Sequence, residues 1–295
     1  MENKENKKPN IKILVACHKP DLNIRQDDIY MPIHVGKALN PDLDLGFIGD
    51  NTGDNISNKN PYYCELTALY WAWKNLKDVD YIGLSHYRRY FSKNIKFTGI
   101  LKLDSIDSQN LIDIKSILSL KDNEVILPKF MRMSNSVQEV FNNRVMEQDI
   151  YILYKIIKEK YPNYLDTFTK YLLGNNKTGF NMFIMNKTNF DKYCQWIFEI
   201  LELSQHFIKP TQYSSYNRIY GYFGEILTAV YCIQNFKIKE NTVLLIDKKE
   251  SNNIFKNLIV KTLNSISYFT GLKWRKKNLD NPYWDTYLKK DGIEI

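Results

Sequence analysis

The chain of 295 residues is 44% hydrophobic and 25% charged, a balance typical of a soluble globular protein with a core large enough for an enzyme site. Its formal net charge of +8 favours an anionic partner, but no helix-turn-helix, zinc-finger or RNA-binding motif indicates nucleic acid. Four widely spaced cysteines imply neither a zinc site nor a disulfide framework, and no signal peptide or membrane span is recognisable, so we expect a cytoplasmic protein, soluble or peripheral to a membrane.

The first half of the chain predicts short buried strands separated by a helix. Residues 11–17 (IKILVAC) are apolar and largely β-branched, as in a buried strand, and residues 43–48 predict a second strand before the turn-rich GDNTGDN. Asn60 followed by Pro61 is a favourable helix start, and apolar residues recur after it at helical spacing. Residues 80–85 (DYIGLS) predict the next strand, which ends at the cluster HYRR.

The second half continues the alternation of strands and helices. Strands are predicted at 124–128, 179–185 and within 236–246, and helices at 148–160, 189–203 and about 217–234. This order is typical of an α/β fold, with a Rossmann-type, mainly parallel sheet flanked by helices. Residues 92–122 are irregular, and we expect them to form a flap or an insertion.

The C-terminal segment after residue 248 has a pattern of its own. Its apolar residues fall largely on one side of a predicted helix, and the basic run LKWRKK follows. Either this side packs on the domain, or residues 252–277 lie on an anionic membrane surface. We divide the chain into a disordered charged tail (1–10), an α/β domain (11–248) and a basic amphipathic, helical C-terminal extension (249–295).

Polar residues follow several of the predicted strands. Ligands of open α/β sheets bind at the carboxyl ends of the strands, and His18, Asp50 and the HYRR cluster all lie just beyond such ends. The chain has 34 lysines but only seven arginines, and two of these are adjacent, at Arg88 and Arg89. Because the planar guanidinium binds phosphate in a bidentate manner, the pair indicates an anion site, although a solvated basic turn is the alternative.

Two other segments are candidates for a site. In the helix at 217–234, Arg218, Gly221, Tyr222 and Glu225 fall on one face, which is either a binding face or an ordinary exposed one. The turn at 50–55 gathers side chains that could ligate a cation or bind a base and ribose, or could merely stabilise the turn itself. No EF-hand, P-loop or G-x-G-x-x-G spacing is present.

Six segments carry a family resemblance, and they occur in the order ILVACHKP, YMPIHVG, DNTGDNISNKNPYYCELTALYWAWKN, DYIGLSHYRRYF, NMFIM with YCQWIFEIL, and GYFGEIL. Over about residues 11–240 they resemble the bacterial capsular-polysaccharide glycosyltransferases long catalogued as a domain of unknown function. The resemblance implies a GT-A-like fold and surface polysaccharide assembly, with galactofuranosyl transfer from UDP-galactofuranose among the activities. The chain departs at GYFGEIL, where the family more often has serine before the glutamate and arginine after it.

The resemblance also implies roles for individual residues. GT-A enzymes hold the donor's diphosphate through a metal on a D-x-D motif, but here that position reads SHYRR, which implies Arg88 and His86 instead of a metal. Glu225 resembles the general base. If the segment is extended, Arg88 faces the diphosphate and Arg89 points away, toward a carboxylate such as Glu65. The residues expected to bind the nucleotide sugar are His18, Asp50, Asn51, Asp54, Asn55, Glu65, Tyr87, Arg89, Asn181 and Arg218.

The expected activity is transfer of galactofuranose or galactose from a UDP-sugar to a growing surface polysaccharide. The acceptor is a glycan or a lipid-diphosphate-linked glycan, and the reaction is inverting and needs no cofactor. The alternatives are a transferase that uses Mn²⁺ or Mg²⁺ on Asp50 and Asp54, a nucleotide-sugar hydrolase or phosphotransferase, and a non-catalytic protein that binds anions or nucleic acid. We expect a cytoplasmic location, with peripheral attachment to the inner face of the plasma membrane as a variant.

Overall fold

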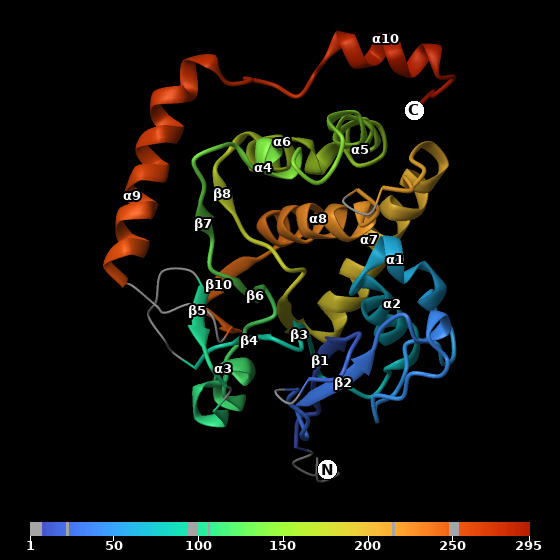
Figure 1. Ribbon diagram of the computed structural model, residues 1–295, viewed down its shortest axis with the longest axis vertical. Coiled ribbons are helices and arrows are strands. Elements are labelled where there is room, and N and C mark those ends of the chain that lie inside the picture. The colour runs from blue at the N-terminus through green and yellow to red at the C-terminus, as the bar shows by residue number, and fades with distance from the viewer. Residues whose placement is uncertain (1–7, 22–23, 94–99, 106, 214–215, 248–253) are drawn as a thin grey trace, which may run out of the picture.

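The computed structural model describes residues 8–21, 24–93, 100–105, 107–213, 216–247 and 254–295. Its centre is a nine-stranded sheet in the order β10-β6-β9-β3-β4-β11-β5, with β1 beside β3 and β2 beside β1 (Figure 1). The strands are β1 (Ile11–Cys17), β2 (Tyr30–His34), β3 (Tyr81–His86), β4 (Arg89–Phe91), β5 (Ile100–Leu103), β6 (Glu124–Pro128), β9 (Phe183–Asn186), β10 (Lys237–Asn241) and β11 (Val243–Ile246).

The strand directions refine the predicted sheet. Strands β2, β1 and β3 are parallel, whereas β9 and β4 pair with β3 in antiparallel fashion. The α/β class is therefore confirmed, with a parallel core that continues into a sheet of mixed direction.

Helices and a small second sheet complete the fold. The second sheet pairs β7 (Met131–Arg132) with β8 (Asn176–Lys177). The helices are α1 (Asn60–Tyr63), α2 (Leu66–Asn75), α3 (Ile114–Leu118), α4 (Val137–Phe141), α5 (Glu147–Lys160), α6 (Leu165–Leu173), α7 (Lys187–Phe207), α8 (Ile219–Asn235), α9 (Ile254–Gly271) and α10 (Pro282–Lys290). Short 3-10 turns lie at Lys37–Leu39, Ser57–Lys59, Ser108–Asn110, Pro162–Tyr164 and Leu272–Trp274.

The core lies on both faces of the sheet because strand side chains alternate. In β1, Leu14 and Ala16 pack with α2, α7 and α8, whereas Ile13 and Val15 pack on the opposite face with residues of β4 and α3. Each face is apolar, which explains why the central strands are continuous apolar runs.

One predicted strand is wrong, and a different segment takes its place. Residues 43–48 form no strand, and Gly46 within them has a φ of 72°. The strand beside β1 is β2, which contains Pro32. Proline cannot donate to a strand partner. On the edge away from β1, however, the described residues give β2 only an isolated bridge from His34 to Gly49, so no donor is needed at Pro32. A proline in the middle made this edge strand hard to recognise.

The remaining segments extend the central sheet or lie at its periphery. Residues 92–122 contribute β5 and α3 to the sheet and its packing, while 94–99 and 106 lie outside the described residues, as do 1–7 of the predicted tail and 249–253 of the extension. Helix α9 runs along the edge that carries β7, and α10 crosses near α5 (Figure 1). The expected C-terminal helical extension is present.

Candidate active site

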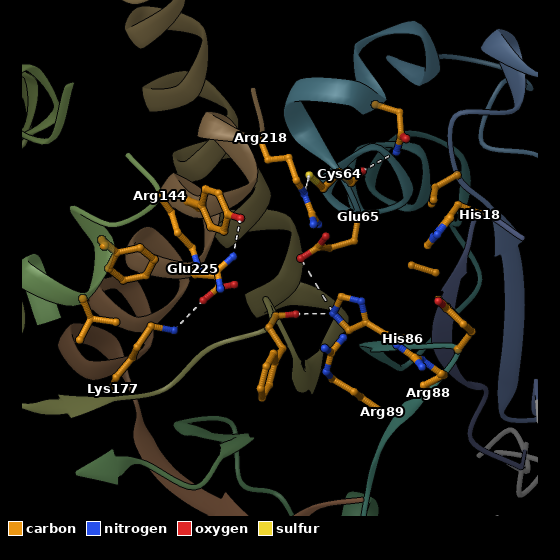
Figure 2. A pocket seen from close by; sticks show the side chains of 18 of the residues that line it. His18, Cys64, Glu65, His86, Arg88, Arg89, Arg144, Lys177, Arg218 and Glu225 are labelled. Carbon is orange, nitrogen blue, oxygen red and sulfur yellow. Dashed lines mark hydrogen bonds and ion pairs between the residues drawn. The ribbon is translucent and has the colours of Figure 1, made fainter. Parts of the chain in front are cut away.

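A cavity of about 710 Å³ opens at the carboxyl end of β3. Its wall combines the β3–β4 hairpin, α1, α8 and the β7–β8 pair, which are far apart in the sequence (Figure 2). The charged residues that line it are Glu65, Arg88, Arg89, Arg144, Lys177, Arg218 and Glu225, with His18 and His86 beside them. Of the residues predicted just beyond strand ends, His18 and the HYRR cluster lie at this cavity, whereas Asp50 does not.

The HYRR segment is a tight hairpin rather than an extended strand. His86 pairs with Arg89 across it, so Tyr87 and Arg88 form the turn. Both arginines consequently line the cavity, because the extended geometry that would have turned Arg89 away does not form. The Arg88 guanidinium lies 5.5 Å from the ring of Tyr87, and that of Arg89 lies 4.7 Å from the ring of Phe180.

Arg89 is a partly desolvated cation in the cavity wall. Its Nε is buried and has no hydrogen-bond partner among the described residues, and no ion pair joins it to Glu65, contrary to expectation. Burial lowers the pKa of this guanidinium, and Glu65 only partly opposes the effect. An unpaired buried N–H is uncommon in native proteins, and this one belongs to a guanidinium in the cavity wall.

Glu65 lines the cavity and belongs to a buried hydrogen-bond network. Asn181 donates through Nδ2 to Glu65 Oε1 at 2.7 Å and to the carbonyl of Gly221 at 3.1 Å. His86 donates through Nε2 to the carbonyl of Phe180 at 2.6 Å, because a carbonyl can only accept. Only Nδ1 of His86 therefore remains for a ligand.

The backbone is strained at this site. Cys64 (φ 53°), Phe180 (φ 70°) and Asn181 (φ 52°) are the non-glycine residues with positive φ in the described part of the chain, and all three lie at or directly behind the cavity. Such conformations persist only where the surroundings hold them, and they cluster at functional sites. Their grouping here supports a functional role for the cavity.

Helix α8 contributes the predicted face, and its two glycines serve packing. Arg218, Tyr222 and Glu225 line the cavity. A Cβ on Gly221 would lie 2.9 Å from Cys64 Sγ, and one on Gly224 would lie 2.7 Å from Leu66 Cδ1. The glycines therefore let α1 and α2 approach α8 closely.

Cys64 is a structural thiol at this contact. Arg218 donates through Nε to its Sγ at 3.0 Å. Burial, followed by the neighbouring carboxylate of Glu65, raises the pKa of Cys64 to about 12. The thiol is consequently neutral near neutral pH and is not activated as a nucleophile.

Glu225 lies on the other side of the cavity from the hairpin (Figure 2). Lys177 on β8 donates to Glu225 Oε2 at 2.7 Å, and only 13% and 16% of the two side chains are exposed. Oε1 of Glu225 accepts no hydrogen bond from the described residues. Nearby, Arg144 donates to the hydroxyl of Tyr222 at 3.1 Å.

The cavity is strongly basic and rich in arginine. Five cationic side chains line it against two carboxylates, an excess of three positive charges without the histidines. Four of the seven arginines of the chain are among them, but only one of its 34 lysines. A ligand with several negative charges fits this surface.

His18 lies at the opposite end of the cavity from Glu225 (Figure 2). Its ring meets that of Tyr87 edge to face, with 5.3 Å between the centroids. Burial lowers the pKa of His18, and the positive charges of Lys19 and Arg218 lower it further. The ring is thus biased toward its neutral form when no ligand is bound.

The turn at 50–55 is not part of the cavity wall. Asp50 is fully buried and accepts hydrogen bonds from the amides of Gly36 and Lys37 and the hydroxyls of Ser57 and Thr67. Asn55 donates to the Asn51 carbonyl within the turn, and Asp54 accepts from the hydroxyl of Tyr70 in α2. The structure does not bring these four residues to the other site candidates.

A metal site is not evident from the side chains either. Within the described ranges, no group of three or more histidine, cysteine, aspartate or glutamate side chains is arranged to hold a metal ion. Asp50 and Asp54, the fallback metal ligands, do not meet in the cavity.

Among the cavity residues that were not predicted, Arg144, Cys64, Phe180 and Lys177 contribute charge, strained backbone or a contact to the site. Arg144 could have been found by its rarity, the argument that singled out Arg88 and Arg89. Cys64 and Phe180 gave no signal, because their positive φ depends on tertiary packing. Lys177 is one of 34 lysines, and its partner Glu225 is 48 residues away, so nothing in the sequence marks it.

Comparisons with known proteins agree with this architecture. The family model described as "Domain of unknown function (DUF4422)" matches residues 12–236. The apo structure of the WbbM bifunctional glycosyltransferase is similar, with a TM-score of 0.72 and 30% identity over 83% of this chain and 48% of that one. The chain thus spans about half of that protein, and the likeness confirms the GT-A-like fold class. Among curated proteins, none matches this chain.

Proposed function

This chain belongs to the DUF4422 family, and from its site and its likeness to a glycosyltransferase we propose that it transfers a sugar from a UDP-sugar to a glycan acceptor. The observation that carries the proposal is a single cavity with an arginine-rich wall opposite a largely buried carboxylate, Glu225. Loss of a diphosphate leaving group and deprotonation of an acceptor hydroxyl need these two features.

In this proposal one side of the cavity binds the leaving diphosphate and the other side deprotonates the acceptor. Arg88 and Arg89 bind the diphosphate and stabilise the charge that grows on the β-phosphate oxygen as its bond to the anomeric carbon breaks. The acceptor oxygen attacks that carbon from the other face, and Glu225 Oε1 takes its proton. This single displacement inverts the anomeric configuration. With the two arginines as the electrostatic partners, joined by Nδ1–H of His86 when that ring is protonated, the proposal requires no metal.

The substrates follow from the family resemblance. We propose galactofuranose or galactose as the sugar and a growing surface polysaccharide as the acceptor, either free or linked to a lipid diphosphate. A lipid-linked acceptor would bring this cytoplasmic protein to the inner face of the plasma membrane. Donor-site residues in this proposal are His18, Glu65, Tyr87 and Arg218 in addition to the two arginines, with Asn181 supporting Glu65 from behind.

Paired substitutions separate the two roles. Glu225→Gln should lower transfer by ~100-fold while leaving UDP binding intact, because it removes only the base. Arg88→Gln should weaken UDP binding by about tenfold or more, because it removes a charged hydrogen bond to phosphate. Arg25→Gln, which alters an arginine paired with Asp27 outside the cavity, is the control and should change neither. Transfer from UDP-galactofuranose and UDP-galactose and calorimetric UDP binding are the measurements.

Several outcomes would contradict the proposal. Full activity of Glu225→Gln would place the base elsewhere. Loss of transfer in EDTA that manganese restores would overturn the metal-free part alone. Consumption of UDP-sugar at the full rate without acceptor would indicate a hydrolase, and salt-sensitive RNA binding without UDP binding would indicate a nucleic-acid-binding protein.

A further inference from the structure

Helix α9 presents its apolar side chains to solvent instead of to the protein. Five large apolar residues at helical spacing are each 54% to 58% exposed: Leu258, Ile259, Leu263, Ile266 and Phe269. In a globular protein such a stripe normally faces the core. The side chains of Ile254 and Phe255, which would extend the stripe, lie outside the described residues.

The opposite side of α9 holds it to the molecule. Asn264 donates through Nδ2 to the carbonyl of Arg132 at 2.8 Å, and the hydroxyl of Tyr268 donates to the carbonyl of Leu173 at 2.8 Å. Tyr268 is buried, unlike its apolar neighbours in the helix. At about 100° per residue, Asn264 and Tyr268 lie on the side away from Leu263 and Ile266, so the stripe points outward. Helix α9 itself lies at the periphery of the fold (Figure 1).

Polar groups within the stripe are already satisfied. The hydroxyls of Thr262 and Thr270 donate to carbonyls one turn earlier in the same helix, Leu258 at 3.0 Å and Ile266 at 2.9 Å. These threonines therefore offer an incoming surface no free donor. Such a face suits a hydrocarbon phase better than a protein partner, which gains its specificity from directional contacts.

The segment after α9 adds an aromatic and basic border. Trp274 is 81% exposed, and the ammonium of Lys273 lies 4.9 Å from its ring. Lys273 and Lys277 are exposed on either side of it. Tryptophan and lysine next to an apolar stripe are typical of helices that lie in the interface of an anionic membrane.

We propose that the outward face of α9, together with Trp274 and the lysines beside it, docks onto an anionic lipid bilayer. A second copy of the chain is the less favoured occupant, because each copy carries a net charge of +8 and the basic border would repel its equivalent. None of the described helices is long and apolar enough to cross a membrane.

Docking would also orient the cavity. Helix α9 lies against β7, whose Met131 lines the cavity, and β7 pairs with β8, which carries Lys177 opposite Glu225. The Glu225 side of the cavity is therefore the side nearest the docking helix. This placement rests on the proposed function, and it suits an acceptor glycan that is carried on a lipid diphosphate.

Vesicle sedimentation of the full chain tests the docking. We expect binding to phosphatidylcholine vesicles that contain phosphatidylglycerol and little binding to phosphatidylcholine alone. The double substitution Leu263→Glu with Ile266→Glu should weaken binding by about tenfold or more, because two half-exposed apolar side chains leave the bilayer. Leu39→Glu, at a leucine 49% exposed in another part of the surface, is the matched control and should bind like the parent.

A second variant, the oligomeric state and UDP binding distinguish membrane docking from the alternatives. Lys273→Glu with Lys277→Glu should remove the preference for phosphatidylglycerol. Equal vesicle binding by parent and double variant would overturn the proposal, as would a dimer that the double variant dissociates while no form binds vesicles. UDP binding is measured on the same preparations: if it persists while vesicle binding fails, the docking proposal alone is refuted, and the reverse result refutes only the proposed function.

Discussion

Arginine provides most of the positive charge in the cavity, although the chain uses lysine nearly everywhere else. The adjacent pair Arg88–Arg89 was recognisable from its rarity, and Glu225 and Arg218 from their shared helix face. That both adjacent arginines face the cavity was not predictable, because this depends on whether HYRR is extended or bent. Residue types thus revealed the chemistry of the site, while side-chain direction needed the fold.

His18 should make UDP binding pH-dependent. Its pKa is lowered by burial and then by neighbouring cations, and a bound diphosphate would oppose this effect, so binding should take up a proton. UDP affinity attributable to His18 should then rise as the pH falls from about 7.5 to about 6. Calorimetry in buffers of different ionisation enthalpy measures the proton uptake.

The control for this prediction is His18→Gln, which keeps a polar side chain but cannot titrate. It should bind UDP with a shallower pH dependence and take up fewer protons. An unchanged profile in this variant would place His18 away from the diphosphate.

At the scale of elements, the strongly periodic helices were the most predictable. The helix expected at 148–160 is α5 (Glu147–Lys160), and the strand at 124–128 is β6. The β3–β4 hairpin was not predicted, because its turn residues Tyr87 and Arg88 lack the positive φ that glycine and asparagine signal in hairpin sequences.

The close contact of α8 with α2 makes Gly224 sensitive to substitution. In Gly224→Ala the added Cβ would lie 2.7 Å from Leu66 Cδ1 and 2.9 Å from Asn181 Oδ1. Overpacking of this kind costs about 1–3 kcal/mol, which should outweigh the ~1 kcal/mol that alanine gains in helix propensity. We expect a lower free energy of unfolding in urea.

Gly271→Ala is the comparison for this change. Gly271 has ordinary helical geometry (φ −82°), and its added Cβ would come no closer than 3.4 Å to the side chain of Arg275. It should be neutral or slightly stabilising. Equal effects of the two substitutions would show that helix propensity, and not packing against α2, decides the outcome.

At the scale of the whole molecule, the C-terminal extension is fastened to the domain. Leu279 and Leu288 are buried in the same hydrophobic core as α5, and Asp280 pairs with Lys158 at 3.0 Å. The division at residue 248 therefore does not separate two cores, and deletion of residues 249–295 would expose the surface of α5. Point substitutions on α9 are the cleaner probe of its outer face.

This attachment predicts a stability cost for Leu288→Ala. Removal of a leucine that is only 3% exposed should lower the free energy of unfolding by about 2–5 kcal/mol. Leu258→Ala, at a leucine 54% exposed on α9, is the matched control and should change it by less than about 0.5 kcal/mol. Similar small effects at both positions in denaturant titrations would mean that α10 is not part of the folded core.

The site also draws together segments that no local pattern connects. Cys64–Glu65, the β3–β4 hairpin, Lys177–Asn181 and α8 meet only through the sheet and its crossovers. From the sequence, strand ends were expected to converge, but the turn at 50–55 was wrongly expected at the site. A turn rich in aspartate and asparagine has the same sequence pattern whether its side chains bind a ligand or hydrogen-bond within the turn.

The strained residues at the cavity have a consequence for how this protein could evolve. Positive φ costs a non-glycine residue about 1 kcal/mol or more, and glycine would relieve that cost at Cys64, Phe180 and Asn181. Glycine would also delete the ring beneath Arg89 and the amide that fixes Glu65. Relief of strain is therefore opposed by the loss of these contacts, so stabilised variants that keep the cavity should gain their stability elsewhere.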